Sequence, residues 1–155
     1  MDEKQHSYEE KAMDLFEKGY NCAQSVFLAF SDLYLIDGKT ALKLSSSFGG
    51  GMGRLREVCG SVSGMFMVAG LLYGYDDPKA YEEKSEHYKR IQELAAEFSR
   101  QNGSIVCREL LGLPEGKDTP KPEKRTEQYY KKRPCKELVG MAAKIMEQYI
   151  QSHPY

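Results

Sequence analysis

Apolar residues recur every three to four positions along most of the chain, which is the spacing of amphipathic helices. The spacing predicts a helix over residues 8–18, ended by Gly19, and a second helix that begins after Asn21, a residue suited to an N-cap. A short helix is predicted from Thr40 to Ser47. No segment alternates apolar and polar residues with the period of two that strands show, so we expect an all-α protein.

The most apolar part of the chain spans residues 58–73 and follows a glycine-rich connector at residues 49–53. Its uncharged run continues to Tyr75, and these 18 residues approach the length of a membrane span. Glycines and serines dilute the run, and charged amphipathic segments flank it, so a buried central helix is the better interpretation. We therefore expect no membrane insertion and a helical bundle packed around residues 58–73.

The second half of the chain alternates helical and loop-like segments. A long charged helix is predicted from the Asp-Pro pair at residues 77–78 to the Asn-Gly pair at residues 102–103, and a short one over residues 105–111. Residues 112–133 contain three prolines, few aliphatic residues and an excess of Lys and Arg. This composition predicts an exposed basic loop, with at most a turn of helix near Tyr129, before a last helix.

Length and composition describe one soluble domain. The 155 residues carry 22 Lys and Arg against 23 Asp and Glu, a net charge of −1, so we expect no binding to nucleic acid. The acidic start of the chain has no apolar segment, which predicts no secretory signal and a cytoplasmic location where thiols stay reduced. We expect a single domain over residues 1–155, with five to seven helices. A homodimer would be compatible with exposed aromatic residues, but the sequence does not show one.

Four cysteines are the strongest candidates for chemistry: Cys22, Cys59, Cys107 and Cys135. None belongs to a C-x-x-C pair, which argues against a zinc ribbon and a thioredoxin-type motif. Each is predicted at or near the start of a different helix, and Cys135 directly follows Pro134. Free N–H groups and the positive end of the helix dipole favour the thiolate there, the form that binds metals and attacks disulfides. From the pattern alone, four buried structural cysteines remain the simpler interpretation.

A second, weaker candidate is an anion-binding turn at the glycine-rich connector. Backbone N–H groups of such a turn, together with a nearby arginine, can bind phosphate or another anion. The stretch lacks the Lys and Ser or Thr of a P-loop and follows no strand, so a plain turn is the simpler interpretation. The residues that would bind a cofactor or anion here are Gly49, Gly50, Gly51 and Arg54.

The histidines do not suggest a hydrolase. His6 and His153 lie near the two ends of the chain, and His87 lies in the charged helix, where a solvated side chain is expected. No carboxylate pair stands out from the ordinary i,i+4 charges of the helices.

The sequence resembles a family of redox-active proteins named for its C-GCAxxG-C-C cysteine pattern. The resemblance covers nearly the whole chain in the same order, with one departure, Ser61 at the alanine position of the central motif. The matching stretches are GYNCAQSVFLAF at 19–30, SFGGGMG at 47–53, CGSVSG at 59–64, GSIVCREL at 103–110 and PCKELV at 134–139.

This resemblance implies a joint redox role for the four cysteines, with a redox partner that the sequence does not identify. In one form the thiolates bind a [2Fe–2S] cluster or another metal for electron transfer or sensing. In the other form pairs of thiols cycle between dithiol and disulfide, with Cys59 the most reactive because the glycine connector leaves its surroundings open. The alternative function is a helical interaction or anion-binding module whose cysteines are structural.

Overall fold

The computed structural model describes residues 7–155, so His6 lies outside the described residues. Within residues 7–155 the regular elements are helices, accompanied by one isolated antiparallel bridge, and the predicted all-α class is confirmed. Six helices have eight or more residues: α1 (Tyr8–Glu17), α2 (Cys22–Ala29), α3 (Gly38–Ser46), α5 (Gly60–Tyr73), α6 (Tyr81–Asn102) and α9 (Cys135–Ser152). The shorter elements are η1 (Ser31–Leu33), α4 (Gly49–Met52), α7 (Cys107–Leu111) and α8 (Glu127–Lys132).

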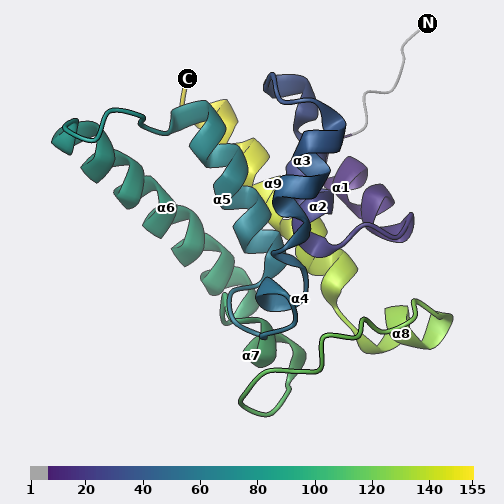
Figure 1. Cartoon of the computed structure of the whole chain (residues 1–155). Coiled ribbons are helices and arrows are strands. Elements are labelled where there is room, and N and C mark those ends of the chain that lie inside the picture. The colour runs from purple at the N-terminus through teal and green to yellow at the C-terminus, as the bar shows by residue number, and fades with distance from the viewer. Residues whose placement is uncertain (1–6) are drawn as a thin grey trace, which may run out of the picture.

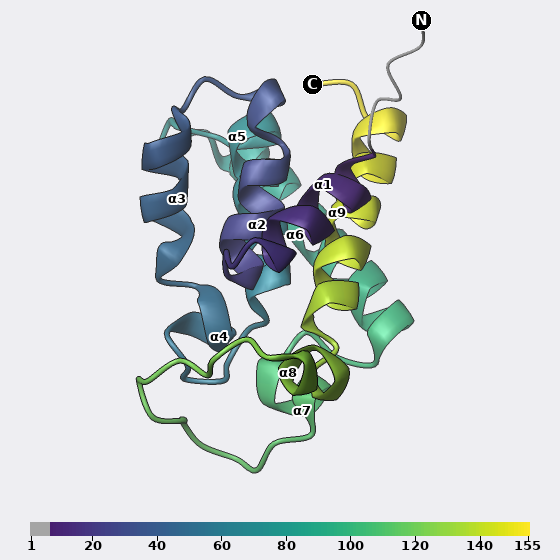
Figure 2. The same cartoon turned by 90° about the vertical axis from the view of Figure 1, so that its right-hand side faces the viewer.

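The long helices run alternately up and down, so every second helix starts at the same end of the bundle (Figure 1). The end at which α2, α5 and α9 start also carries α4, α7 and α8, while the C-terminus lies at the opposite end. The segment that joins α7 to α8 crosses the same end (Figure 2). As a result, the first residues of α2, α5 and α9 come together, although they are far apart in the sequence.

Helix α5 is the apolar centre of the bundle, and eight of its 14 residues are buried. It packs closely on α2 because Gly64 has no side chain: a Cβ there would lie 2.7 Å from the carbonyl oxygen of Ala23. The helix begins at Gly60 rather than at the predicted residue 58, because Val58 forms the antiparallel bridge with Val106. Among the described residues, no helix has both the length and the apolar character needed to cross a membrane.

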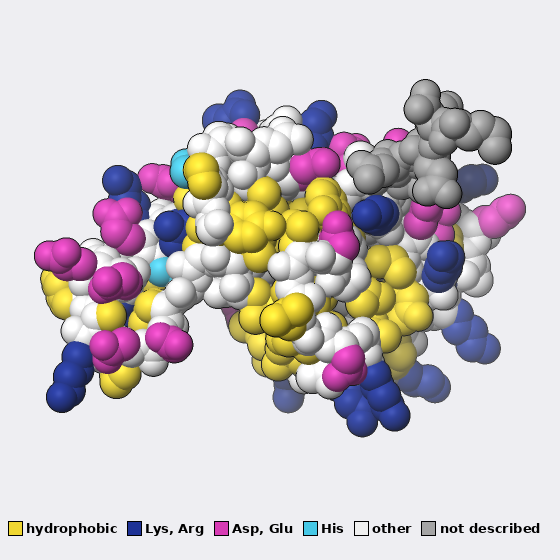
Figure 3. Space-filling model, turned by 90° about the horizontal axis from the view of Figure 1, so that it is seen from above, with side chains coloured by type: hydrophobic (Ala, Val, Ile, Leu, Met, Phe, Trp, Pro, Cys, Tyr) yellow, Lys and Arg dark blue, Asp and Glu magenta, His cyan; other side chains and the backbone are white. Residues whose placement is uncertain are grey.

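His87 on α6 is buried, contrary to the prediction of a solvated side chain. Only 8% of its surface is exposed, its Nδ1 lies 3.0 Å from Nη1 of Arg90, and the ring of Tyr75 packs edge-on against it. The connection from α5 to α6 places Tyr75 over the helix face that the charge pattern alone assigns to solvent. Burial, and then the Arg90 charge, lower the pKa of His87. Seen from above, acidic and basic side chains surround a more hydrophobic centre of the molecule (Figure 3).

Candidate functional site

The four cysteines line one cavity of about 200 Å³ at the end of the bundle where α2, α5 and α9 start. Cys22, Cys107 and Cys135 are the first residues of α2, α7 and α9, and Cys59 is the N-cap residue of α5. The prediction that each cysteine opens a helix is confirmed. All four are free thiols; Cys22 is partly exposed and the other three are buried.

Cys22 is positioned by a capping box and by a glycine on the neighbouring helix. The side chain of Asn21 accepts a hydrogen bond from the backbone N–H of Gln24 at 2.9 Å, and Gln24 accepts one from the backbone N–H of Asn21 at 3.0 Å. A Cβ at Gly60 would lie 3.1 Å from the Cβ of Cys22. Because Gly60 directly follows Cys59, this close approach of α2 to α5 brings the two cysteines to the same cavity.

Cys59 and Cys107 are positioned by the antiparallel bridge between Val58 and Val106. The backbone N–H of Cys59 donates to the carbonyl of Ile105 at 2.8 Å, and the N–H of Cys107 donates to the carbonyl of residue 57 at 2.5 Å. Side chains alternate between the two faces of an extended segment. The two cysteines, each one residue beyond the bridging valines, therefore lie on the same face of the bridge.

The glycine-rich connector reaches the cavity through a run of left-handed backbone. Gly51 has φ +69°, and a Cβ there would lie 2.6 Å from the Cβ of Cys107. Non-glycine residues in the same region cost energy, which the surrounding contacts must offset. The turn contains three such residues with φ between 61° and 70°: Met52, Arg54 and Arg56.

Cys22 and Cys135 line the same cavity, and their thiols shift each other's pKa in opposite directions. Interaction with the Cys22 thiol, then with the Tyr129 hydroxyl and the charges of Arg133 and Arg125, lowers the pKa of Cys135 to about 7, against burial, which raises it. Interaction with the Cys135 thiol, followed by burial, raises the pKa of Cys22 well above its ordinary value. The thiolate is therefore favoured on Cys135 and disfavoured on Cys22.

The other two thiols are kept protonated by burial. Burial raises the pKa of Cys59 to about 11, and it also raises the pKa of Cys107, against a hydrogen bond from Arg56. Cys59 is only 5% exposed, so the open surroundings expected for it are absent, and its raised pKa disfavours the thiolate. That Cys59 is the most reactive thiol stays a prediction that these two observations argue against. A thiolate on Cys135 would also raise the pKa of Cys107, so one thiolate opposes formation of the next.

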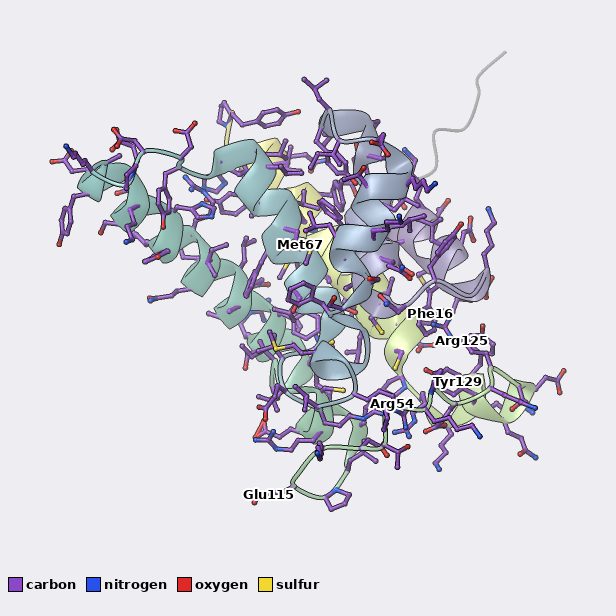
Figure 4. All side chains as sticks on the ribbon, in the orientation of Figure 1. Phe16, Arg54, Met67, Glu115, Arg125 and Tyr129 are labelled. Carbon is purple, nitrogen blue, oxygen red and sulfur yellow. The ribbon has the colours of Figure 1, made fainter. Side chains whose placement is uncertain are left out.

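Four arginines line the cavity: Arg54, Arg56, Arg125 and Arg133. Arg54 and Arg56, which lie in the glycine-rich turn, form ion pairs with Asp118 at 3.0 and 3.1 Å. Arg133 forms an ion pair with Glu123 at 2.6 Å. Arg125 instead donates to the backbone carbonyls of Phe16 and Tyr20, with its guanidinium 3.8 Å from the centre of the Phe16 ring. Figure 4 shows Arg125 and Tyr129 on the same side of the molecule, below Phe16.

The sequence analysis missed the part of the site that comes from residues 112–133. The segment is largely exposed and contains α8 near Tyr129, as predicted, yet Arg125, Arg133 and Pro122 line the cavity. The excess of basic residues directly before Cys135 is the sequence feature that could have indicated a place for this segment at the cavity, because cations stabilise a thiolate.

The predicted anion-binding turn and the cysteines share one cavity, which Gly49, Gly50, Gly51 and Arg54 also line. The two candidate sites that the sequence offers as alternatives are therefore neighbours.

The sequence also predicts that a metal is bound jointly by Cys22, Cys59, Cys107 and Cys135. Over residues 7–155, no three or more Cys, His, Asp or Glu side chains are grouped so that they could hold one metal ion.

Comparison with known proteins gives one match. Residues 20–149 match the family model described as "Putative redox-active protein (C_GCAxxG_C_C)", and this range contains all four cysteines. No curated protein and no solved structure matches the chain.

Proposed function

The chain belongs to the C_GCAxxG_C_C family, and from this premise we propose that it carries out thiol–disulfide exchange through Cys22 and Cys135. The observation that supports the proposal is that Cys22 and Cys135 line one cavity and shift each other's pKa in opposite directions, which favours a thiolate on Cys135 and a thiol on Cys22. Cys59 and Cys107 both have raised pKa values, so they are the less favourable nucleophiles.

The two roles follow from the pKa directions. Cys135, with a pKa of about 7, is largely thiolate just above neutral pH and attacks the sulfur of a disulfide substrate. Cys22 retains its proton until that attack and then resolves the mixed disulfide, closing a Cys22–Cys135 bridge. Tyr129 and Arg133 stabilise the thiolate of Cys135 and so make it both the better nucleophile and the better leaving group.

A second candidate is an iron–sulfur centre bound by the four thiolates. It is favoured by the position of all four cysteines around one cavity beside several arginines, whose charge would offset that of the thiolates. A bound cluster would supply one-electron transfer. Among residues 7–155 no three Cys, His, Asp or Glu side chains are grouped so that they could hold a metal ion, which is why the dithiol is the first proposal.

Counting thiols separates the two candidates. Protein purified without oxygen is assayed for iron and acid-labile sulfide, and its thiols are counted before and after mild oxidation, followed by mapping of the disulfide. We expect four thiols when reduced and two when oxidised, with Cys22 and Cys135 joined. The variants Cys22→Ser and Cys135→Ser should each abolish this bridge, and the matched control Cys59→Ser should retain it.

Other outcomes would contradict the dithiol. A bridge between another pair of cysteines, or no loss of thiols on oxidation, would remove its basis. Stoichiometric iron and sulfide, together with protection of all four thiols from alkylation, would establish the cluster in its place.

A further inference from the structure

We propose that the substrate of the Cys22–Cys135 dithiol is a small disulfide with anionic ends, such as carboxylates, bound in the cavity beside Arg56. This inference rests on the proposed thiol–disulfide exchange and specifies its substrate class. It draws on three properties of the cavity that the exchange itself does not require: its charge, an unpartnered donor and its size.

The cavity has an excess of positive charge. Four arginines line the cavity, and two carboxylates form ion pairs with them. Asp118 pairs with two of the arginines, and Glu123, which also lines the cavity, pairs with a third. An excess of two positive charges therefore remains while the thiols are protonated, and an excess of one remains when Cys135 is the attacking thiolate. Arg125 contributes to this excess, since both of its hydrogen bonds go to backbone carbonyls.

Arg56 carries a donor that is unsatisfied within residues 7–155. Its side chain is only 7% exposed, Nη1 lies 3.6 Å from Sγ of Cys107, and Nη2 lies 3.1 Å from a carboxylate oxygen of Asp118. The third nitrogen, Nε, is buried and has no hydrogen-bond partner among the described residues. A buried donor without a partner is unfavourable, so an acceptor oxygen that reached Nε through a small shift of this cavity-lining side chain would be stabilised. An anionic group suits this position because guanidinium groups bind carboxylates and oxyanions through several N–H groups.

The size of the cavity limits the ligand. About 200 Å³ is below the roughly 300–1,000 Å³ of pockets that hold drug-sized ligands. A cavity of this size suits a disulfide with two short arms better than a nucleotide cofactor or a folded partner. Arg56, Cys22 and Cys135 all line this cavity, so an anionic end held at Arg56 keeps the S–S bond inside the cavity that the thiol pair lines.

The exchange balances without a further reagent. The Cys135 thiolate attacks one sulfur of R–S–S–R, its bond to that sulfur forms as the S–S bond breaks, and R–S⁻ leaves. Cys22 then gives its proton to the first R–S⁻ and attacks Sγ of Cys135, which releases the second R–S⁻ and forms the Cys22–Cys135 disulfide. The substrate gains two electrons and becomes two thiols after protonation, and the protein dithiol loses the same two electrons.

Three small disulfides of similar length and different end charge test the proposal. They are dithiodiglycolate, which is anionic, bis(2-hydroxyethyl) disulfide, which is neutral, and cystamine, which is cationic. The fully reduced protein is mixed with each one, and formation of the protein disulfide is followed. Each rate is divided by the rate of the same compound with free 2-mercaptoethanol, which removes intrinsic reactivity. We expect the anion to react about tenfold or more faster than the neutral compound, and the cation to react slowest.

The variants separate site binding from overall charge. Arg56→Gln should lose most of the preference for the anion, while Arg100→Gln, which removes an exposed arginine on α6 away from the cavity, should keep it. Since Arg56→Gln can also perturb the fold, thiodiglycolate is added to the unaltered protein. This thioether has the same anionic ends but no S–S bond, so it should slow the reaction with dithiodiglycolate by occupying the site.

The failures are distinguishable. Equal normalised rates for the three compounds, an unchanged preference in Arg56→Gln, or no inhibition by the thioether would overturn the anionic substrate while the dithiol function stands. Failure of the protein to reduce any of the three disulfides would overturn the proposed function itself.

Discussion

Nη1 of Arg56 lies 3.6 Å from Sγ of Cys107, across 51 positions of the sequence. The same guanidinium binds Asp118 in the segment between α7 and α8. One buried arginine thus joins the glycine-rich turn, the start of α7 and the segment that crosses the end of the bundle. The charge that it places beside the thiol opposes the effect of burial on the pKa of Cys107.

Replacing Arg56 by Gln should raise the pKa of Cys107 further, because the hydrogen bond and the charge that favour its thiolate are lost. Stability should fall by about 1.5–3 kcal/mol, the usual range for a hydrogen bond to a charged group. The pH dependence of Cys107 alkylation and urea unfolding measure the two effects. Arg54→Gln is the control, since Arg54 also binds Asp118. Equal alkylation of Cys107 in both variants would show that the Arg56 contact does not act on the thiol.

Cys135 should be the first of the four thiols to be alkylated near neutral pH. Its pKa of about 7 gives a thiolate at pH values where the other three remain protonated. Tyr129→Phe removes a hydrogen-bond donor to its sulfur, so the midpoint of its alkylation should move to higher pH. Mass spectrometry of the protein after brief treatment with iodoacetamide at several pH values measures both. Faster alkylation of Cys59 at pH 7 would contradict this prediction.

Gly51→Ala should destabilise the protein much more than Gly112→Ala. Both glycines have a left-handed backbone, with φ of +69° and +66°, so both substitutions incur a similar conformational strain of about 1–2 kcal/mol. A Cβ at Gly51 would also lie 2.6 Å from the Cβ of Cys107, whereas nothing lies within 4 Å at Gly112. The steric conflict should add about 1–3 kcal/mol. Urea unfolding of the two variants measures the difference, and equal losses would mean that Cys107 moves freely.

Two glycines of α5 should respond to alanine with opposite signs. Gly70→Ala adds a methyl group where nothing lies within 4 Å, so the gain in helix propensity should stabilise the protein by about 0.5–1 kcal/mol. Gly64→Ala would press against the backbone of Ala23 and should destabilise it by about 1–3 kcal/mol. Thermal unfolding followed by circular dichroism compares them. A Gly64→Ala protein as stable as the parent would show that α2 and α5 can separate at little cost.

His87 should make the protein less stable in mild acid. Its pKa is lowered in the folded state, so folding disfavours the proton; the stabilisation is full above about pH 6.5 and is lost as the pH falls below that value. His87→Asn keeps an acceptor for Arg90 and cannot take up a proton. The decrease in stability between pH 7.5 and pH 5, measured by urea unfolding, should therefore be smaller in the variant. An equal decrease in both proteins would assign the pH dependence to other groups.

The sequence by itself determined the helical class, the central apolar helix and the position of each cysteine at a helix start. These features depend on local signals, such as the spacing of apolar residues, the Asn21 cap and the glycine and proline breaks, which act within a few residues. Only the tertiary structure decided that Cys22 and Cys135 come to one cavity and that Cys135, not Cys59, has the lowered pKa. It also placed Arg125 against Phe16, 109 positions away, and buried His87. A pKa depends on burial and on charges within a few ångströms. Both are set by contacts between segments that are distant in the sequence, and a local sequence pattern does not show which distant segments come into contact.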